Sequence, residues 1–368
     1  MSPRADRGNT ALAEIIPQHP VKLRCRNVWK VYGPRPNYYF DTRGYQIDAA
    51  ELTRRMRAEN HLPAVVDANF DVHEGEIVVI MGLSGSGKST LVRCLSRLVD
   101  PSHGQVLLDG KDLLAASARE LIEIRRHKMG MVFQNFGLLP HLTVLENIAF
   151  PLKLQGRDQK TREARAREVI KLVELEGRET SYPHQLSGGQ QQRVGIARSL
   201  AVGPDLWFLD EPFSALDPMI RRQMQDEFLR LQAQLRKTIV FITHDIMEAC
   251  RIADRIALMR DGRIIQIGTP AEILLTPADA YVAEFTEDVA FGRVIRAGDL
   301  AQEAAVPDGA VPEGATEVSA DDPLDRLLGQ IATGSTGFRV TASARRKGGV
   351  LTREAVLSVM NRTPGRAA

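Results

Sequence analysis

Short runs of continuously apolar residues recur along this 368-residue chain, and several of them end at polar side chains. EIVVIMG at 76–82, DLWFLDE at 205–211 and TIVFITHD at 238–245 show this pattern. Runs of this length are typical of parallel strands that are buried on both faces. VKLRCRNVWKVY at 21–32 alternates roughly, and together with AVVDANFDV at 64–72 it predicts further strands. The pattern indicates an α/β fold.

Helical spacing and turn signals fill the segments between these strands. We expect helices within 48–60, at 89–99 and over most of 115–205. Asp-Gly pairs at 109–110 and 261–262 predict the tight turns of two hairpins.

The two ends of the chain have a different pattern. Residues 1–20 are expected to form a flexible tail, and the stretch 289–322, rich in Ala, Gly, Pro and acids, a linker. The final segment, 323–368, contains GFRVTASARRKGGVLTREAVLSVM at 337–360, which predicts two strands and a helix. Its basic run at 345–347 suits either contact with anionic lipid or a solvated turn, and the turn is the commoner case.

Composition narrows the class of protein without choosing a function. Apolar residues make up 43% and charged residues 26% of the chain, as in soluble globular proteins. The net charge of +2 gives no reason to expect nucleic-acid binding, which would need a clustered basic face. The three cysteines lack metal-ligand spacing and fit a reducing compartment. Because no secretory h-region and no run of about 18 apolar residues is present, a membrane role would need a partner.

A phosphate-binding motif follows the first of the buried strands. GLSGSGKST fits G-x-x-x-x-G-K-[ST] between a strand and a helix, which is the context that this motif requires. Its glycines let backbone N–H groups converge, and the helix N-terminus adds positive partial charge. Lys88 would reach the β- and γ-phosphates of a nucleotide, and the Ser89 hydroxyl would bind Mg²⁺. The candidate nucleotide-binding residues are Gly82, Leu83, Ser84, Gly85, Ser86, Gly87, Lys88, Ser89 and Thr90.

Polar side chains that suit hydrolysis end two other apolar runs. Asp210 and Glu211 lie at the sheet edge where α/β proteins bind ligands. Asp210 would hold Mg²⁺, directly or through water, and Glu211 would be the general base toward an attacking water. His244 would contact the γ-phosphate and hold the water, and Gln134, after a short strand, would be a weak Mg²⁺ ligand.

Each of these features also has a purely structural interpretation. A glycine-rich turn, a surface turn with two acids and a structural histidine would explain the phosphate motif, the acids and His244 separately. For Gln134 a solvated turn is at least as common as a metal ligand. The combination of the motifs, more than any one of them, favours a nucleotide site.

Six motifs in order resemble those of the ATP-binding-cassette (ABC) ATPases. The likeness covers about residues 21–288 and rests on GLSGSGKST, QNFGLL, LSGGQ, LWFLDEP, SALD and THD. It implies a P-loop NTPase of ABC type with ATP and Mg²⁺ as ligands. The implied fold has a RecA-like core, an antiparallel β subdomain, a helical subdomain at about 135–205 and a short α/β C-terminal tail.

The resemblance also implies a head-to-tail homodimer with two ATP molecules between the subunits. Ser187 and Gly189 lie at a predicted helix start, where exposed N–H groups suit an anion. The residues that would face the γ-phosphate held by the other subunit are Ser187, Gly188, Gly189 and Gln190. Asp217 of SALD would signal between the two sites, and Tyr32 matches the aromatic residue that stacks on adenine. A capped helix and a core tyrosine are the plain alternatives.

Within that family the chain resembles the ATPases of glycine betaine, proline betaine and choline importers. The insertion at 33–63 and the sequences around the phosphate motif and SALD carry this likeness. Those relatives often end in two CBS modules, whereas about 45 residues follow the expected linker here, like half of one module. CBS modules that bind adenosine commonly have an acid three residues after the threonine that matches Thr352, and this chain has Ala355 there, so sensing by the tail is in doubt.

The resemblance therefore implies the ATPase subunit of a quaternary-amine importer, peripheral on the cytoplasmic face of the inner membrane. Permease subunits would hold it there, a separate substrate-binding protein would act through the permease, and no nucleic acid would be involved. A cassette for another small solute is one alternative, and a soluble ABC ATPase is another, although no coiled-coil insertion or second cassette is visible. A regulatory module without hydrolysis would have lost one of Lys88, Asp210, Glu211 or His244, and all four are present. The sequence does not identify the solute, the permease or the role of the insertion.

Overall fold

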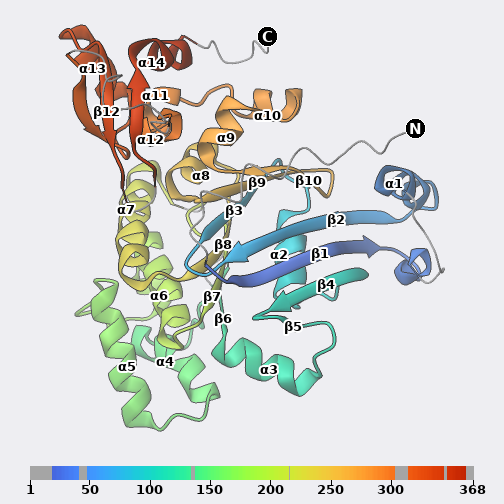
Figure 1. Cartoon of the computed structure of the whole chain (residues 1–368). Helices are drawn as coiled ribbons and strands as arrows, with labels where there is room; N and C mark the ends of the chain where they lie inside the picture. The colour runs from blue at the N-terminus through green and yellow to red at the C-terminus, as the bar shows by residue number, and fades with distance from the viewer. Residues whose placement is uncertain are drawn as a thin grey trace. The chain divides into compact units, whose positions relative to one another are not determined.

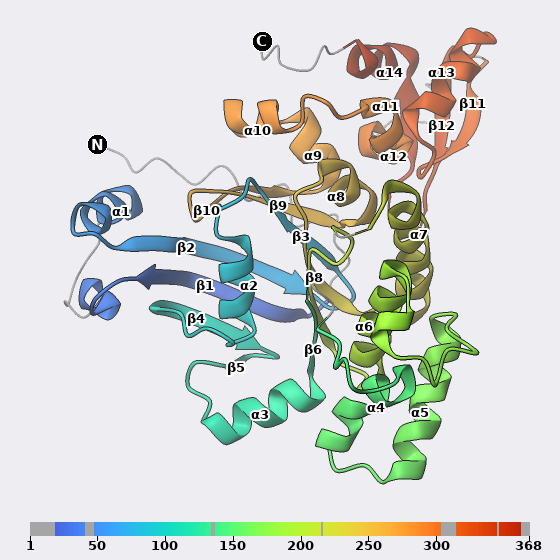
Figure 2. The same cartoon turned by 180° about the vertical axis from the view of Figure 1, so that it is seen from behind.

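The computed structural model describes residues 19–40, 48–133, 137–214, 216–302, 314–343 and 346–361. These residues fall into two compact units, one from Pro20 to Ile267 and one that comprises the described residues from Gly268 onward together with His19. Figures 1 and 2 show the chain from two sides, coloured from the N-terminus to the C-terminus. Gln134, the predicted amide ligand, lies outside the described residues.

A six-stranded sheet forms the centre of the first unit. Its strands, in the order β10-β9-β3-β8-β7-β6, are β3 (Ile77–Met81), β6 (Met129–Val132), β7 (Leu206–Asp210), β8 (Thr238–Ile242), β9 (Arg255–Arg260) and β10 (Arg263–Gly268). β3 pairs in parallel with β8 and β9, and β7 with β6 and β8. Every residue of β3, β7 and β8 is buried. The predicted parallel strands are confirmed, and burial on both faces explains why their sequences do not alternate.

A four-stranded sheet, in the order β2-β1-β4-β5, shares its core with the central sheet. Its strands are β1 (Val21–Tyr32), β2 (Leu62–His73), β4 (His103–Leu108) and β5 (Lys111–Asp112). β1 pairs antiparallel with β2 and β4. The predicted Asp-Gly turn joins β4 to β5, and Asp109 and Gly110 have φ angles of 51° and 75°, as a tight hairpin turn requires.

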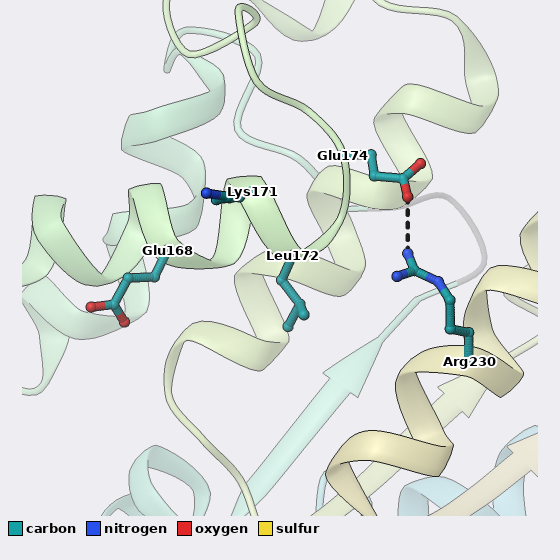
Figure 3. A pocket seen from close by; sticks show the side chains of 5 residues that line it. All are labelled: Glu168, Lys171, Leu172, Glu174 and Arg230. Carbon is teal, nitrogen blue, oxygen red and sulfur yellow. Dashed lines mark hydrogen bonds and ion pairs between the residues drawn. The ribbon is translucent and has the colours of Figure 1, made fainter.

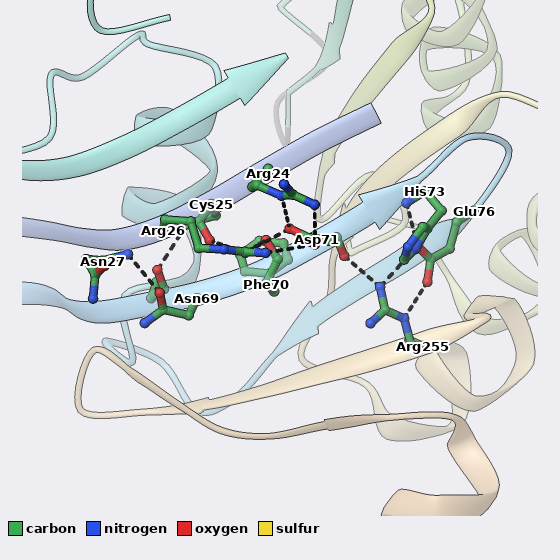
Figure 4. A network of polar contacts seen from close by, with 11 residues as sticks. Arg24, Cys25, Arg26, Asn27, Asn69, Phe70, Asp71, His73, Glu76 and Arg255 are labelled. Carbon is green, nitrogen blue, oxygen red and sulfur yellow. Dashed lines mark hydrogen bonds and ion pairs between the residues drawn. The ribbon is translucent and has the colours of Figure 1, made fainter. Parts of the chain in front are cut away.

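A network of arginines and acids connects the two sheets (Figure 4). Arg24 and Arg26 of β1 donate to the Asp71 carboxylate over 3.1 Å and 2.8 Å. Arg255 of β9 donates to the backbone oxygen of Asp71 over 2.6 Å and to Glu76 over 3.1 Å. Because Arg255 belongs to the central sheet and Asp71 to β2, polar contacts reinforce the packing of the apolar core between them.

The segment that the sequence marks as an insertion builds a small core of its own beside β1 and β2. It contains η2 (Pro36–Tyr39) and α1 (Ala49–Ala58). The buried members of this cluster are Trp29, Val31, Tyr39, Leu52, Met56 and Val66. Tyr39 Oη lies 2.7 Å from Glu59 Oε2 and 2.9 Å from His61 Nδ1, and His61 Nε2 lies 2.7 Å from the oxygen of Pro34. The insertion thereby contacts the turn that follows Tyr32.

Helices cover the sheets and fill the segment between β6 and β7, as predicted (Figure 1). They are α2 (Lys88–Leu95), α3 (Ala118–His127), α4 (Val144–Leu154), α5 (Gln159–Leu172), the short η3 (Pro183–Gln185), α6 (Gly188–Ala201), α7 (Pro218–Leu235) and α8 (Ile246–Ile252). α4 contacts both α5 and α6. Capping boxes begin α3 and α4, because Ser117 and Thr143 each exchange hydrogen bonds with a glutamate three residues later.

The second unit starts with short helices and ends in a small α/β fold. Its elements are α9 (Pro270–Leu275), α10 (Ala280–Phe285), α11 (Phe291–Val294), α12 (Ala297–Leu300), β11 (Thr316–Ser319), α13 (Leu324–Ala332), β12 (Gly337–Thr341), β13 (Gly349–Thr352) and α14 (Arg353–Met360). The predicted strand, strand and helix correspond to β12, β13 and α14. In contrast, α11, α12 and β11 lie in the stretch 289–322 where a linker is expected. β11 pairs in parallel with β12. The fold is therefore β-α-β-β-α, and the predicted strand, strand and helix are its last three elements.

The basic run of this unit is partly held in ion pairs. Arg346 lies 2.9 Å from Asp299 and 2.6 Å from Asp321, while Arg345 lies outside the described residues. Thr352 caps α14 by accepting a hydrogen bond from the N–H of Ala355 over 3.2 Å. Among the described helices of the whole chain, none is long and apolar enough to cross a bilayer.

Candidate active site

Three adjacent strands of the central sheet deliver the predicted catalytic residues to one edge. β3, β8 and β7 are neighbours and run in parallel. The loop from Gly82 follows β3, His244 follows β8, Asp210 ends β7 and Glu211 comes next. Because the carboxyl ends of parallel strands meet at one edge, residues from three distant parts of the sequence come together there.

Backbone contacts from a hairpin shape the rear of the phosphate loop. A Cβ atom on Gly82, which has a φ of 147°, would lie 2.2 Å from the backbone oxygen of Met259 in β9. The N–H of Gly262, in the predicted Asp-Gly turn between β9 and β10, donates to the oxygen of Ser86 over 3.0 Å. Only glycine therefore fits at position 82 without moving the central sheet.

The predicted phosphate-binding lysine closes over its own loop. Lys88, the first residue of α2, donates from Nζ to the backbone oxygens of Gly82 over 2.8 Å and Leu83 over 3.0 Å. Burial lowers the pKa of Lys88, although the carboxylates of Glu211 and Asp210 oppose that shift. Leu83 is 60% exposed, so the outer part of the loop faces solvent and is accessible to a ligand.

Two of the predicted magnesium ligands, Ser89 and Asp210, lie among the described residues and contact each other. Ser89 Oγ donates to Asp210 Oδ1 over 3.2 Å. Burial raises the pKa of Asp210, and the hydrogen bond from Ser89 opposes that shift. Ser89 comes from α2 and Asp210 from β7, so the central sheet places these two oxygen donors together.

The predicted base and the predicted histidine form a pair. His244 Nδ1 lies 3.2 Å from Glu211 Oε2. Glu211 has a left-handed backbone with a φ of 46°, and its N–H donates to the oxygen of Ile242 over 3.0 Å. A small cavity beside the pair is also lined by Ser214, Arg221, Asp245 and Glu248.

The LSGGQ residues lie at the start of α6, as expected. Ser187 caps this helix through a capping box with Gln190: Ser187 Oγ accepts from the N–H of Gln190 over 3.3 Å, and Gln190 Oε1 accepts from the N–H of Ser187 over 3.0 Å. A Cβ atom on Gly189 would lie 2.9 Å from Ile220 of α7, and one on Gly188 would lie 3.6 Å from Leu216. The α6 N-terminus is therefore packed against the turn and first residues that begin α7.

Asp217 and Tyr32 each lie at the end of an element of the first unit. Asp217 caps α7 by accepting hydrogen bonds from the N–H groups of Met219 and Ile220. Tyr32 is the last residue of β1, is 43% exposed, and has the Lys30 ammonium 5.0 Å from its ring centroid. A core tyrosine is thereby excluded, because nearly half of the side chain faces solvent.

Arg221 and Glu248 were not singled out by the sequence analysis. Arg221 lies in MIRRQMQDEF, where arginines are typical of the solvated face of a helix. Glu248 lies in a short helix and is only 5% exposed, with a hydrogen bond of 2.8 Å from Gln225. The signal that would have pointed to them is their spacing from Asp217 and His244, at four residues in each case.

A second pocket, on the helical part of the first unit, has a different character (Figure 3). It is lined by Glu168, Lys171, Leu172, Glu174 and Arg230, and the last two form an ion pair of 3.0 Å. None of the residues from the strand ends takes part. Its lining carries charges of both signs, so it does not favour one class of ligand.

Comparison with known proteins establishes the family of this chain. A family model described as ABC transporter matches residues 65–214. The trimethylamine N-oxide transport system ATP-binding protein TmoW of Ruegeria pomeroyi is 56% identical over 306 residues, which cover 83% of this chain and 88% of that protein. The chain belongs to the ABC transporter ATP-binding proteins. The resemblance on which the sequence analysis rests is thus confirmed, and the chain is an ABC-type ATPase.

Further relatives of this ABC protein agree with that assignment. The glycine betaine/proline betaine transport system ATP-binding protein ProV of Escherichia coli is 48% identical over 282 residues, covering 77% of this chain and 70% of that protein. The solved dimeric structure of MJ0796, a bacterial ABC transporter cassette, is 36% identical with a TM-score of 0.56 and covers 67% of this chain and 98% of its own. The predicted cassette fold is confirmed.

Proposed function

We propose that this ABC ATPase energises an importer of small osmolytes with a fully substituted, positively charged nitrogen. Trimethylamine N-oxide is the cargo that has most support. The observation that carries this choice is coverage. The match to the trimethylamine N-oxide protein spans 88% of that protein at 56% identity, whereas the matches to the glycine betaine/carnitine protein GbuA, at 55% identity, and to ProV, at 48%, each span 70%. Trimethylamine N-oxide, glycine betaine and choline share this nitrogen, which aromatic side chains of a binding protein recognise through cation–π contacts.

Within one chain, ATP would lie along the loop from Gly82 to Thr90. Its phosphates would meet the backbone N–H groups and Lys88, and its adenine would stack on Tyr32. Glu211 would polarise the attacking water, and His244, which contacts Glu211, would hold the water near the γ-phosphoryl group. Hydrolysis would depend chiefly on this positioning and on electrostatic stabilisation of the charge that develops.

The residues present also fit a magnesium ion. Ser89 Oγ and Asp210 Oδ1 lie 3.2 Å apart and are hard oxygen donors of the kind that Mg²⁺ prefers. Gln134, outside the described residues, is the third proposed ligand. When bound, the ion would neutralise negative charge on the transferred phosphoryl group.

We infer that the working unit is a homodimer. The MJ0796 cassette, which this chain resembles, was solved as a dimer. The residues of each subunit that would complete the nucleotide site of the other are Ser187, Gly188, Gly189 and Gln190. The N–H groups at the start of α6 that the capping box does not use support this role, because such groups suit an anion. Asp217, which caps α7 beside them, would relay the state of one site to the other.

Permease subunits would hold this dimer at the cytoplasmic face of the inner membrane, and a separate binding protein would deliver the solute to them. The names of the relatives support this arrangement, because each is the ATP-binding protein of a transport system.

The decisive experiment is uptake of labelled trimethylamine N-oxide, glycine betaine and choline. The cells should lack other carriers for these solutes and contain the permease and binding protein that are proposed as partners. We expect uptake of trimethylamine N-oxide with the wild-type chain and none with Lys88→Ala. Arg222→Ala, a charge loss on the exposed part of α7, is the matched control. Uptake of none of the three solutes, while ATPase activity persists, would contradict the proposed cargo.

A further inference from the structure

The guanidinium group of Arg221 reaches two segments that belong to different parts of the active site. Arg221 lies in the first turn of α7, and its NH2 group donates to the backbone oxygen of Leu216 over 3.0 Å. Its NH1 group lies 3.8 Å from Asp245 Oδ2. Leu216 immediately precedes Asp217, and Asp245 immediately follows His244. One side chain therefore touches both the turn that carries Asp217 and the loop that carries His244.

The surroundings of Arg221 hold its side chain in this place. The side chain is 30% exposed, and its Nε atom is buried, with no hydrogen-bond partner among the described residues. It lines the same small cavity as Glu211 and Glu248. Burial raises the pKa of Glu248, and the charge of Arg221 is among the effects that oppose this shift. Of the residues that line this cavity, Arg221 is the one arginine or lysine, and Glu211, Asp245 and Glu248 are acids.

The neighbouring arginine shows that this placement is specific. Arg222 is one residue further along α7, which turns its side chain by about 100° around the helix axis. It is exposed and does not line the cavity. The two residues share charge, size and helix, and differ in whether they contact the active-site segments.

We propose that Arg221 is a positioning residue that couples the turn carrying Asp217 to the His244–Glu211 pair. This inference rests on the proposed function, in which the Asp217 turn faces the second subunit. When a second subunit docks on this turn, it would fix the position of the Leu216 oxygen. Through its contacts with Leu216 and Asp245, Arg221 would then fix the position of Asp245 and of the adjacent His244. A guanidinium group is suited to this task because its fork of N–H groups can contact two segments at once, here through a hydrogen bond of 3.0 Å to Leu216 and an ion-pair contact of 3.8 Å with Asp245. Arg221 touches neither the phosphate loop nor Tyr32, so nucleotide affinity would not depend on it.

Steady-state ATPase kinetics of the purified full-length chain test this role. We expect Arg221→Ala to lower kcat at least about tenfold while the half-saturating ATP concentration stays within about twofold, because only the arrangement of the hydrolytic pair is lost. Arg221→Lys should recover part of the loss, since an ammonium group can reach one of the two partners but not both. Arg222→Ala should stay within about twofold of wild type in both constants.

A second measurement separates this role from a merely structural one. In the Glu211→Gln background, ATP should still drive dimerisation of Arg221→Ala, as judged by size-exclusion chromatography, because the sites that bind ATP are intact. An unchanged kcat in Arg221→Ala would overturn the proposal. Equal losses of kcat and ATP affinity, or no recovery with Arg221→Lys, would also overturn it and indicate general destabilisation. If the wild-type chain neither binds ATP nor dimerises with it, the proposed function itself fails.

Discussion

His244 Nδ1 lies 3.2 Å from Glu211 Oε2, although 33 positions separate the two residues in the chain. The contact follows from the sheet, because Asp210 of β7 pairs with Ile242 of β8. The residues that follow both strands must then meet. Glu211 also adopts a left-handed backbone, which costs a non-glycine residue about 1 to 2 kcal/mol and which persists here because its N–H bonds to Ile242. The carboxylate is thus positioned by the backbone of two strands.

Replacing Glu211 by Gln should abolish turnover while keeping the shape of the site. Loss of a general base lowers rates by about 10² to 10⁴-fold, and the amide can still contact His244. We expect phosphate release to fall by that range and an ATP-bound dimer to accumulate. Phosphate release and size-exclusion chromatography in ATP measure the two effects. Rapid turnover by Glu211→Gln would remove Glu211 as the base.

The close approach of α6 to α7 predicts different effects at two adjacent glycines. A methyl group on Gly189 would lie 2.9 Å from Ile220, whereas one on Gly188 would meet Leu216 at an ordinary 3.6 Å. We expect Gly189→Ala to lower the free energy of unfolding by about 1 to 3 kcal/mol, because the Ile220 side chain or the helix that carries it must shift to make room. Gly188→Ala should change it by less than about 1 kcal/mol. Urea unfolding measures both, and equal effects would contradict this packing argument.

The network around Asp71 predicts a pH-dependent contribution to stability. Burial raises the pKa of Asp71, but the hydrogen bonds from Arg26 and Arg24 outweigh it and hold the pKa below its ordinary value of 3.8. A carboxyl group with a lowered folded-state pKa stabilises the fold above its unfolded pKa and loses that effect as the pH falls through the folded pKa. Asp71→Asn should therefore cost about 1 kcal/mol at neutral pH.

The pH dependence supplies the test of that assignment. The difference in urea midpoint between wild type and Asp71→Asn should shrink as the pH is lowered past 3.8, the ordinary value for this group. Glu74→Gln is the control, because it removes a carboxylate nearby in the sequence that is not among the groups that shift the pKa of Asp71. A difference that does not change with pH would mean that the ion pairs with Arg24 and Arg26 contribute nothing.

The insertion predicts an effect on nucleotide affinity without one on turnover. Tyr39 Oη contacts Glu59 and His61, and His61 contacts the oxygen of Pro34 next to the turn after Tyr32. Burial and the neighbouring Glu59 raise the pKa of Tyr39 to about 12, so the phenol stays protonated and can donate. Tyr39→Phe should weaken ATP binding by roughly two- to fivefold, the effect of losing about one hydrogen bond that positions Tyr32.

Tyr38→Phe is the matched control, because Tyr38 is the preceding residue and is 57% exposed. It should leave both ATP affinity and kcat unchanged. A fluorescent ATP analogue measures the affinity and phosphate release measures kcat. If Tyr39→Phe lowers kcat and leaves affinity intact, the insertion does not act through Tyr32.

Sequence patterns predicted those parts of the fold that depend on residues close together in the sequence. β3, β7 and β8 are buried on both faces, so their apolar runs are continuous, and the phosphate motif needs only one strand and one helix start. β11 escaped prediction because four residues, TEVS, are too few to show a period. Contacts between distant segments escaped as well. Nothing in the sequence near Arg221 indicates that its guanidinium reaches Asp245, 24 positions away.

The hairpin of β9 and β10 acts on the phosphate loop through main-chain atoms alone in the contacts described above. Met259 presents its carbonyl oxygen to Gly82, and Gly262 its N–H to Ser86. Main-chain atoms are the same in every residue, so the hairpin side chains that lie outside the buried core can vary without altering the shape of the loop. A change in the length of the hairpin or in the handedness of its turn would alter the shape of the loop. Substitutions at the exposed positions of the hairpin should therefore be tolerated during evolution. An insertion or deletion of a single residue there would instead displace the phosphate loop.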